Sequence, residues 1–326
     1  MTEEEIINTS SRRLISIDLF KAISIILMVY VNTLRPYENV PAWSKHAVDY
    51  GLTFVDLIAP FFIFMLAINT KLSYTKRLKN YGRQNAILRH LRRFLILIGV
   101  GLLFTMYVGE DGFYLRWGTL EVLGSSGLLL LFVVELKYYY RLIFGFLLML
   151  VHQTFLNIGL ASIIYDGIEG GIVGIFGWGS MAIFSSVLGE GLKKNKPHNH
   201  FIFGGIFCIV IALISAPFLS ISRQYISIPY IFITVGISSI LFYIFFWIFE
   251  KGLKIQEVER KLKIIVVLSK NAFILFLIHI ITISFIYEIF PFDIPYLVII
   301  SIGILNVIII WFIAYLLDKG DMYLIV

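Results

Sequence analysis

Four polar side chains, Asn32, His46, Asp56 and His279, stand in or beside long apolar runs of the chain. Ionisable groups at the depth of a bilayer are energetically costly, so such residues are candidates for function. A histidine accepts or donates a proton near neutral pH, and a carboxylate can orient it. Asp56 either orients such a catalytic partner or caps the helix that begins near Thr53. His279 by itself is also explained as a hydrogen-bond partner between helices, and His46 as a solvated loop residue.

The apolar runs that position these residues dominate the composition. Of the 326 residues, 59% are hydrophobic and 15% are charged, whereas about a quarter of an ordinary soluble domain is charged. This composition excludes a soluble enzyme and a disordered chain. A membrane-spanning helix needs roughly 20 apolar residues, and continuous runs of this kind fit helices rather than the short alternating strands of a β-barrel. We therefore predict an all-α integral membrane protein with about ten spans. The candidate spans are residues 14–34, 52–70, 94–108, 118–135, 140–158, 171–191, 201–221, 229–249, 264–287 and 294–317.

The basic residues predict how these spans are oriented, because Lys and Arg gather on the cytoplasmic side of a membrane. With the N-terminus inside, the outer loops hold only Arg35, Lys45, Arg116 and Arg223, which leaves 23 of the 27 basic residues inside. Both termini are therefore predicted to be cytoplasmic, with residues 1–13 preceding a single transmembrane domain of residues 14–326. A predicted inner loop from residue 71 to residue 93 contains no acidic residue. It is either the ordinary inner-face charge signal, with affinity for anionic lipid, or a site for an anionic cofactor.

Motifs of soluble enzymes are absent from the sequence. It contains no G-x-S-x-G, P-loop or H-E-x-x-H pattern and no clustered Cys and His residues, so we predict neither a metal nor a nucleic-acid partner. The glycines at 170, 171, 174, 177 and 179 fit close helix packing better than a phosphate loop. Glu121, inside a predicted span, needs a partner or a proton, because an isolated carboxylate would not persist in hydrocarbon.

Several motifs occur in a fixed order along the chain. Residues 13–32 contain R-x-x-S-x-D-x-F followed by an apolar run that ends in M-V-x-V-N. Residues 45–64 contain K-H-A, G-L-T and then D-L-x-x-P-F-F-x-F. Arg92-Arg93 precede an apolar run with two glycines, W-G-T-L begins at Trp117, and Asn271 and His279 occupy an N-x-x-x-x-F-x-x-H pattern. In this order the motifs resemble the heparan-α-glucosaminide N-acetyltransferase catalytic family.

The resemblance implies a multi-pass enzyme of the cell membrane that uses cytosolic acetyl-CoA to acetylate a glucosamine-type amine across the membrane. The expected acceptor is an amino sugar or glycan of the cell envelope, and membrane lipid and a second copy of the chain are the other expected partners. By resemblance His46 is the catalytic histidine and Asn32 its companion. The chemistry of acyl transfer further predicts that Asn32 donates to the developing oxyanion and that Asp56 orients His46, as the acid does in a catalytic triad. His46 acts either as a base or as a nucleophile that carries the acetyl group.

The remaining predicted contacts and the departures from the family pattern also follow from this resemblance. Residues expected to bind acetyl-CoA are Arg89, Arg92, Arg93, Lys21, Lys270 and Asn271, and those expected at the acceptor are His279 and Glu121. Lys21-Ala22 replaces Arg-Gly, and Glu121 and Val122 replace residues of other types, so the acceptor or acyl donor is expected to differ, or the activity to be lost. Lys21 and Asn32 also replace the Arg and His of the acyltransferase-3 group, which disfavours O-acetylation by that scheme. A transporter or flippase, and a membrane scaffold or sensor, are the alternatives.

Overall fold

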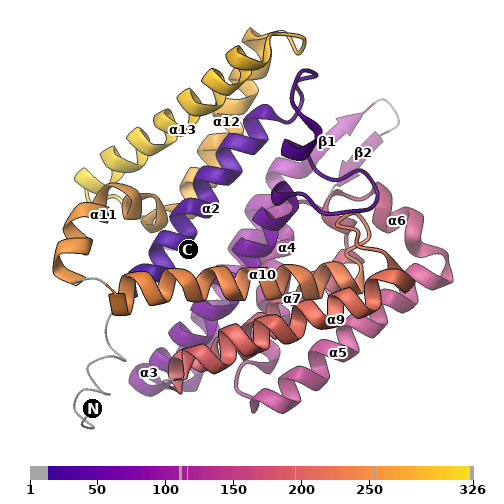
Figure 1. Cartoon of the computed structure of the whole chain (residues 1–326), viewed down its shortest axis with the longest axis vertical. Coiled ribbons are helices and arrows are strands. Elements are labelled where there is room, and N and C mark those ends of the chain that lie inside the picture. Colours follow the sequence, from indigo (N-terminus) through magenta and orange to yellow (C-terminus); the bar gives the residue numbers. More distant parts are fainter. Residues whose placement is uncertain (1–13, 110–111, 116, 195, 253–254, 324–326) are drawn as a thin grey trace. The chain divides into compact units, whose positions relative to one another are not determined.

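The computed structural model describes residues 14–109, 112–115, 117–194, 196–252 and 255–323 (Figure 1). The predicted cytoplasmic segment 1–13 and Arg116 lie outside these residues. The described chain is mainly helical, as predicted, and it divides into two compact units. Unit 1 combines Met1–Lys45 with Leu241–Ile325, and unit 2 is His46–Ile240.

Eight helices of the described chain are long and apolar enough to cross a membrane, so the protein is a multi-pass membrane protein. Each of the ten predicted spans overlaps helical structure. Two of them, 52–70 and 94–108, overlap the two ends of α3 (Ile58–Thr105), and one, 118–135, contains the shorter apolar helix α4 (Thr119–Val133). The count of ten spans and the cytoplasmic position of the termini remain predictions.

Unit 1 is a group of helices around α2. Its elements are α2 (Ile15–Leu34), η1 (Ala42–Ser44), the end of α10 (Ile228–Phe246), η6 (Trp247–Gly252), α11 (Ile255–Lys270), α12 (Ala272–Ile289) and α13 (Tyr296–Lys319). Helix α2 packs against α11, α12 and α13. The carboxylate of Glu250 accepts hydrogen bonds from the Ser16 backbone N–H at 3.0 Å and hydroxyl at 3.1 Å, so it satisfies the first turn of α2 from another segment.

One predicted span of unit 1 is wrong in its extent. The sequence predicts a single span over residues 264–287, but the structure has α11 and α12 with a break at Asn271, whose φ of −119° and ψ of 31° are not helical. The amide of Asn271 donates to the Met322 carbonyl at 3.0 Å. This hydrogen bond gives the Asn271 side chain a partner at the break between the helices. Hydropathy alone does not detect the break, because apolar residues continue on both sides.

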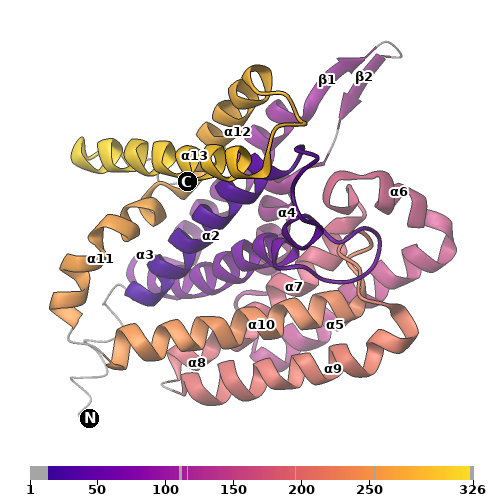
Figure 2. The ribbon, with the colours of Figure 1, turned by 45° about the horizontal axis from the view of Figure 1, so that its top comes forward.

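Unit 2 contains the remaining elements. They are η2 (Phe54–Leu57), α3, β1 (Met106–Gly109), β2 (Gly112–Leu115), α4, α5 (Tyr138–Phe155), η3 (Leu156–Leu160), α6 (Ala161–Asp166), η4 (Ile168–Gly170), α7 (Gly174–Leu188), α8 (Glu190–Lys193), η5 (Asn199–Phe203), α9 (Gly204–Leu219) and the first part of α10. Helices α9 and α10 run side by side (Figure 2), and Gly205 and Gly236 face one another's backbone where they meet. A Cβ at either glycine would lie within 3.1 Å of the other helix, so the close approach requires glycine.

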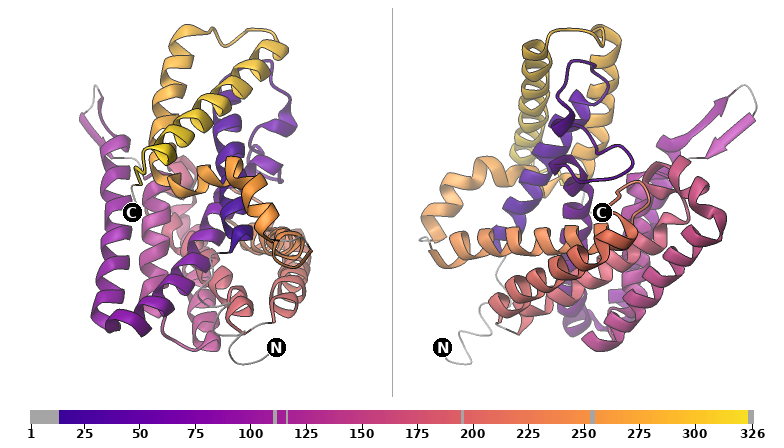
Figure 3. Two further views of the ribbon diagram at one scale, coloured as in Figure 1. Left: turned by 90° about the vertical axis from the view of Figure 1, so that its left-hand side faces the viewer. Right: turned by 45° about the vertical axis from the view of Figure 1, so that its right-hand side comes forward.

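The predicted inner loop at residues 71–93 is wrong, because the structure continues as helix through it. Helix α3 turns back on itself (Figure 3), at Gly82, whose φ of 80° and ψ of 172° interrupt the helical backbone. The rings of Tyr74 and His90 then meet across the turn with centroids 5.5 Å apart. The Lys, Arg and Gln residues here are good helix formers, so a charged segment outside the bilayer need not be a loop.

The structure also contains a small antiparallel β-hairpin, which the predicted all-α class does not include. Strands β1 and β2 pair Met106 with Leu115 and Gly109 with Gly112. The hairpin continues directly from the end of α3 (Figure 3), where the sequence predicts the last residues of a span. The backbone of Gly112 has a φ of 125°, which only glycine adopts readily, and this residue marks the turn.

Candidate active site

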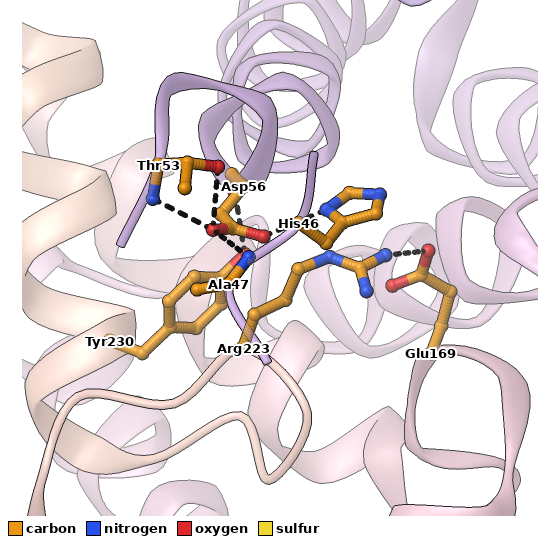
Figure 4. A network of polar contacts seen from close by, with 7 residues as sticks. All are labelled: His46, Ala47, Thr53, Asp56, Glu169, Arg223 and Tyr230. Carbon is orange, nitrogen blue, oxygen red and sulfur yellow. Dashed lines mark hydrogen bonds and ion pairs between the residues drawn. The ribbon is translucent and has the colours of Figure 1, made fainter. Parts of the chain in front are cut away.

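His46 and Asp56 form the polar centre of unit 2. Nδ1 of His46 donates to Oδ1 of Asp56 at 2.8 Å (Figure 4). The Asp56 side chain is fully buried, whereas the His46 side chain is 30% exposed. Because Nδ1 holds its proton toward the carboxylate, Nε2 has the free lone pair. The pair therefore presents a histidine in one tautomer, with the basic nitrogen directed away from its partner.

The other oxygen of Asp56 caps the helix that begins with η2. Oδ2 accepts hydrogen bonds from the Thr53 backbone N–H at 2.8 Å, the Thr53 hydroxyl at 3.0 Å and the Ala47 N–H at 3.2 Å. The Asp56 carboxylate therefore makes the contacts expected for both interpretations that the sequence left open. One oxygen satisfies backbone donors at a helix start, and the other holds His46.

The loop that carries His46 is fixed by a second loop, residues 220–227. The Gly51 N–H donates to the Ile221 carbonyl at 2.8 Å, and the Tyr230 hydroxyl donates to the Asp56 carbonyl at 2.8 Å. Tyr165, at the end of the α5–α6 segment, donates to Asp49 at 2.7 Å. The charge distribution assigns all three of these connecting segments to the same side of the membrane. Their association within unit 2 agrees with the predicted alternation of the spans.

Sequence analysis did not identify a partly buried ion pair beside this centre. Arg223 donates from Nη2 to Oε1 of Glu169, and the two side chains are 16% and 8% exposed. Burial lowers the pKa of Arg223, but the carboxylates of Glu169 and Asp56 outweigh this effect, so the net shift is upward. The sequence signal was weak: Arg223 is one of few basic residues in the predicted outer loops, and its partner lies 54 positions away.

Asn32 and His279 form a separate polar pair within unit 1. The Asn32 amide donates to Nε2 of His279 at 3.3 Å, and Nδ1 of His279 donates to the Phe276 carbonyl. The Tyr287 hydroxyl donates to the Asn32 carbonyl. His279 is 2% exposed. Both of its ring nitrogens are therefore occupied by protein groups, as expected for a histidine that joins helices.

Three of the residues expected to bind acetyl-CoA lie on the second half of α3. Arg89 and Arg92 are exposed, and Arg93 is partly buried with its guanidinium 6.0 Å from the Phe94 ring. Nε of Arg93 is buried and has no hydrogen-bond partner. Arg89 and Arg92 are thus accessible to an anionic ligand.

The other residues expected at the donor lie in unit 1, and two of them already hold protein groups. Lys270 donates to the Asp318 carboxylate and lies 5.5 Å from the Tyr323 ring, and Asn271 holds the Met322 carbonyl. Lys21 is partly buried on α2. Lys270 and Asn271 therefore attach the C-terminal residues to the break between α11 and α12.

Glu121 has the partner that its position in an apolar span demands. Its Oε1 accepts a hydrogen bond from the Thr105 hydroxyl at 2.6 Å, and the side chain is fully buried. Oε2 lies against Gly101, where a Cβ would come within 2.4 Å, so the carboxylate fills space that only a glycine leaves open. Oε2 is also buried without a hydrogen-bond partner. These contacts join the second half of α3 to α4.

A basic cleft of about 280 Å³ lies in unit 2 among segments that the charge distribution assigns to the cytoplasmic side. Its polar lining includes Lys71, Lys137, Lys193 and Lys194, the carboxylates of Glu135 and Glu190, and the rings of Tyr138 and Tyr139. The Lys71 ammonium donates to the Val134 carbonyl at 2.5 Å and lies 3.5 Å from the Glu190 carboxylate, whereas the Lys194 ammonium lies 4.7 Å from the Tyr138 ring. Lys71 begins the basic segment 71–93 that the sequence singled out, but sequence analysis missed the other three lysines, because they form no motif.

Comparison with known proteins agrees with the sequence motifs. Residues 13–168, just under half of the chain, match the family model described as heparan-alpha-glucosaminide N-acetyltransferase, catalytic. The first half of the chain therefore resembles this family. His46, Asp56 and Asn32 lie within the matched residues, whereas Glu169, Arg223 and His279 lie beyond them.

Two curated relatives carry the same family name. The chain is 37% identical over 93 residues to heparan-alpha-glucosaminide N-acetyltransferase of Homo sapiens, and 34% identical over 96 residues to the Mus musculus protein of that name. The aligned region covers 28% of this chain in both cases, and 13% and 14% of the relatives. The similarity is therefore concentrated in a short part of much longer proteins.

Proposed function

We propose that the protein is a membrane-embedded acyltransferase that moves an acetyl group from cytosolic acetyl-CoA to an amine of an amino sugar on the extracytoplasmic side. The observation that carries this proposal is the His46–Asp56 pair within the matched region. A histidine with a buried carboxylate on one nitrogen and an accessible second nitrogen is suited to take a proton from an attacking nucleophile.

In the proposed reaction His46 acts through Nε2. This nitrogen takes a proton from the acceptor amine as the amine nitrogen forms a bond to the thioester carbonyl carbon. The C–S bond then breaks, and His46 returns the proton to the leaving thiolate. Asp56 keeps the proton of Nδ1 in place and stabilises the imidazolium while it exists. In a covalent version, Nε2 itself attacks the carbonyl, and the acetyl group passes from His46 to the amine in a second step.

The donor is proposed to bind at the predicted cytoplasmic side. The basic cleft offers lysine ammonium groups for phosphate and two tyrosine rings for stacking, and Arg89 and Arg92 are accessible on α3. This set fits a ligand with several phosphate groups better than Lys270 does, since that ammonium is engaged by Asp318. Asn32 remains a proposed active-site residue on the basis of the sequence resemblance.

The test is acetyl transfer by the purified full-length protein in lipid nanodiscs, with radiolabelled acetyl-CoA and glucosamine. We expect labelled N-acetylglucosamine from the wild-type protein and a loss of about 10²–10⁴-fold in His46→Ala, which removes the proton acceptor. The control for folding is the thermal unfolding midpoint of His46→Ala. We expect this midpoint to fall, because a buried oxygen of Asp56 loses its donor, but to stay above the temperature of the transfer assay.

Two outcomes would contradict the proposal. Transfer by His46→Ala at the wild-type rate would remove His46 from the site. A wild-type protein that moves the sugar across a sealed vesicle membrane but releases no CoA would favour a transporter. Trapping of labelled acetyl on His46 after donor is added alone would distinguish the covalent version from direct transfer.

A further inference from the structure

Glu169 has a buried carboxylate oxygen without a hydrogen-bond partner. Oε1 accepts from Arg223, whereas Oε2 is inaccessible to solvent and unpaired. An unpaired buried carboxylate oxygen is unfavourable, so a structure that retains one has a position prepared for a hydrogen-bond donor. Figure 4 shows Glu169 and Arg223 in the same network of side chains as His46 and Asp56.

The backbone holds Glu169 in place at an energetic penalty. Its φ of 50° and ψ of 33° are left-handed, which is unfavourable for a residue other than glycine. The indole N–H of Trp178, which is fully buried, donates to the Glu169 carbonyl at 3.0 Å and fixes this conformation. Strained residues of this kind concentrate at functional sites.

The loop that carries Arg223 is fixed against the same segment. The side chain of Ile226 lies over a row of three glycines, where a Cβ at Gly170, Gly174 or Gly177 would come within 3.0 Å of it. His152 donates from Nε2 to the Tyr225 carbonyl at 2.9 Å. The sequence predicts that these glycines serve close helix packing. Gly170, Gly174 and Gly177 instead leave room for a loop side chain, whereas Gly179 packs against Leu129 of α4. Glu169 and Arg223 therefore lie on segments that are held against α7 and α5 by hydrogen bonds and packing.

The charges around this pair favour a cationic ligand. The groups that act on Arg223 include the carboxylates of Glu169 and Asp56 and the hydroxyl of Tyr230. The two carboxylates and the guanidinium together carry a net charge of −1. The side chains of His46 and Arg223 are partly exposed, at 30% and 16%, so a ligand can reach the edge of the centre, and the Glu169 side chain must turn to present Oε2 to it.

We infer that Glu169, held by Arg223, binds the ammonium group of the acceptor through its unpaired oxygen, so that the site selects an amino sugar over a neutral sugar. The bound ammonium releases one proton to water before the neutral amine attacks the thioester. This inference rests on the proposed function for the identity of the acceptor, and it adds the residues that recognise the amine. Glu169 and Arg223 lie beyond the residues that match the family model.

The test is equilibrium binding to the full-length protein in nanodiscs by scintillation proximity, with radiolabelled glucosamine and glucose as probes. These sugars differ only in an amine or a hydroxyl at one carbon. We expect the wild-type protein to bind glucosamine about tenfold or more tightly than glucose, the range expected for a hydrogen bond to a charged group. In Glu169→Gln the amide oxygen still accepts from Arg223, but the NH2 group meets the ammonium, so the preference should disappear while glucose binding stays unchanged.

The matched control is Glu135→Gln, because Glu135 is also paired with an arginine in unit 2, through hydrogen bonds from Arg83 at 3.0 and 3.1 Å. We expect this variant to keep the preference. An unchanged preference in Glu169→Gln would overturn the inference, because a water molecule would then supply the missing donor. An equal loss of binding to glucosamine and to glucose would also overturn the inference, since Glu169 would then act only in folding. The result does not depend on acetyl transfer, which tests the proposed function separately.

Discussion

Two histidines of this protein differ in what holds them. His46, in unit 2, gives one nitrogen to a buried carboxylate and leaves the other free on a side chain that is 30% exposed. His279, in unit 1, is 2% exposed and bonded at both nitrogens, to the Phe276 carbonyl and to the Asn32 amide. The sequence resemblance gives each a place in a motif, but their partners give them different chemistry.

The partners determine which histidine can gain a proton. Nε2 of His46 has a lone pair and can take a proton while Nδ1 stays bonded to the Asp56 carboxylate. Protonation of Nε2 in His279 would place its new N–H against the N–H of Asn32 and break their hydrogen bond. We therefore expect His46 to take part in proton transfer and His279 to hold Asn32 in a fixed orientation.

The largest effect that would sharpen this comparison is expected for Asp56→Asn. The single amide oxygen is needed by the N–H groups of Thr53 and Ala47, so the NH2 group faces His46 and forces the proton from Nδ1 to Nε2. The basic nitrogen is then lost, and acetyl transfer should fall by about 10²–10⁴-fold. The rate of glucosamine acetylation measures this. A variant within threefold of the wild type would show that His46 does not act as we propose.

For His279→Ala we expect a smaller loss of the transfer rate than for Asp56→Asn, but a larger loss of stability. The substitution opens a buried cavity and leaves the Asn32 amide without its acceptor, so the protein should lose about 2 kcal/mol of stability. Thermal unfolding in detergent measures the loss. Acetyl transfer should fall less than about tenfold if His279 takes no part in proton transfer. A fall as large as that of Asp56→Asn, in a protein that remains folded, would break the comparison.

The smallest effect is expected for Thr53→Ala, which removes one of the three donors to Oδ2 of Asp56. The Thr53 and Ala47 backbone N–H groups still hold the carboxylate, so stability should fall by about 0.5–1 kcal/mol, the usual contribution of a capping side chain. The transfer rate should change less than about threefold. Thermal unfolding and the rate of glucosamine acetylation measure these two effects. A loss of transfer as large as that of Asp56→Asn would mean that the capping hydrogen bond of the Thr53 hydroxyl is also needed to orient His46.

Hydropathy predicted most of the helices, because a continuous apolar run satisfies its backbone in lipid only as a helix. It failed where the signal is local. The turn at Gly82 lies among charged residues that are good helix formers, and the break at Asn271 lies between two apolar segments. Neither position changes the average hydropathy enough to mark the end of an element.

The candidate site was predictable only within short stretches of sequence. His46 and Asp56 lie ten positions apart in one motif, and their contact was expected. Arg223 and Glu169 lie 54 positions apart, and the Asn32–His279 pair spans 247 positions. Such pairings depend on which helices become neighbours, and one sequence carries no information on that.

The left-handed backbone at Glu169 has a consequence for directed evolution. A glycine at this position would relieve a backbone penalty of about 1–2 kcal/mol, but it would also leave the Arg223 guanidinium without its carboxylate, which costs more. Selection for heat resistance should therefore retain Glu169 unless Arg223 is replaced by an uncharged residue in the same gene. Enrichment of Glu169→Gly only together with a substitution of Arg223 would show that the ion pair, and not the backbone conformation, decides which residue occupies this position.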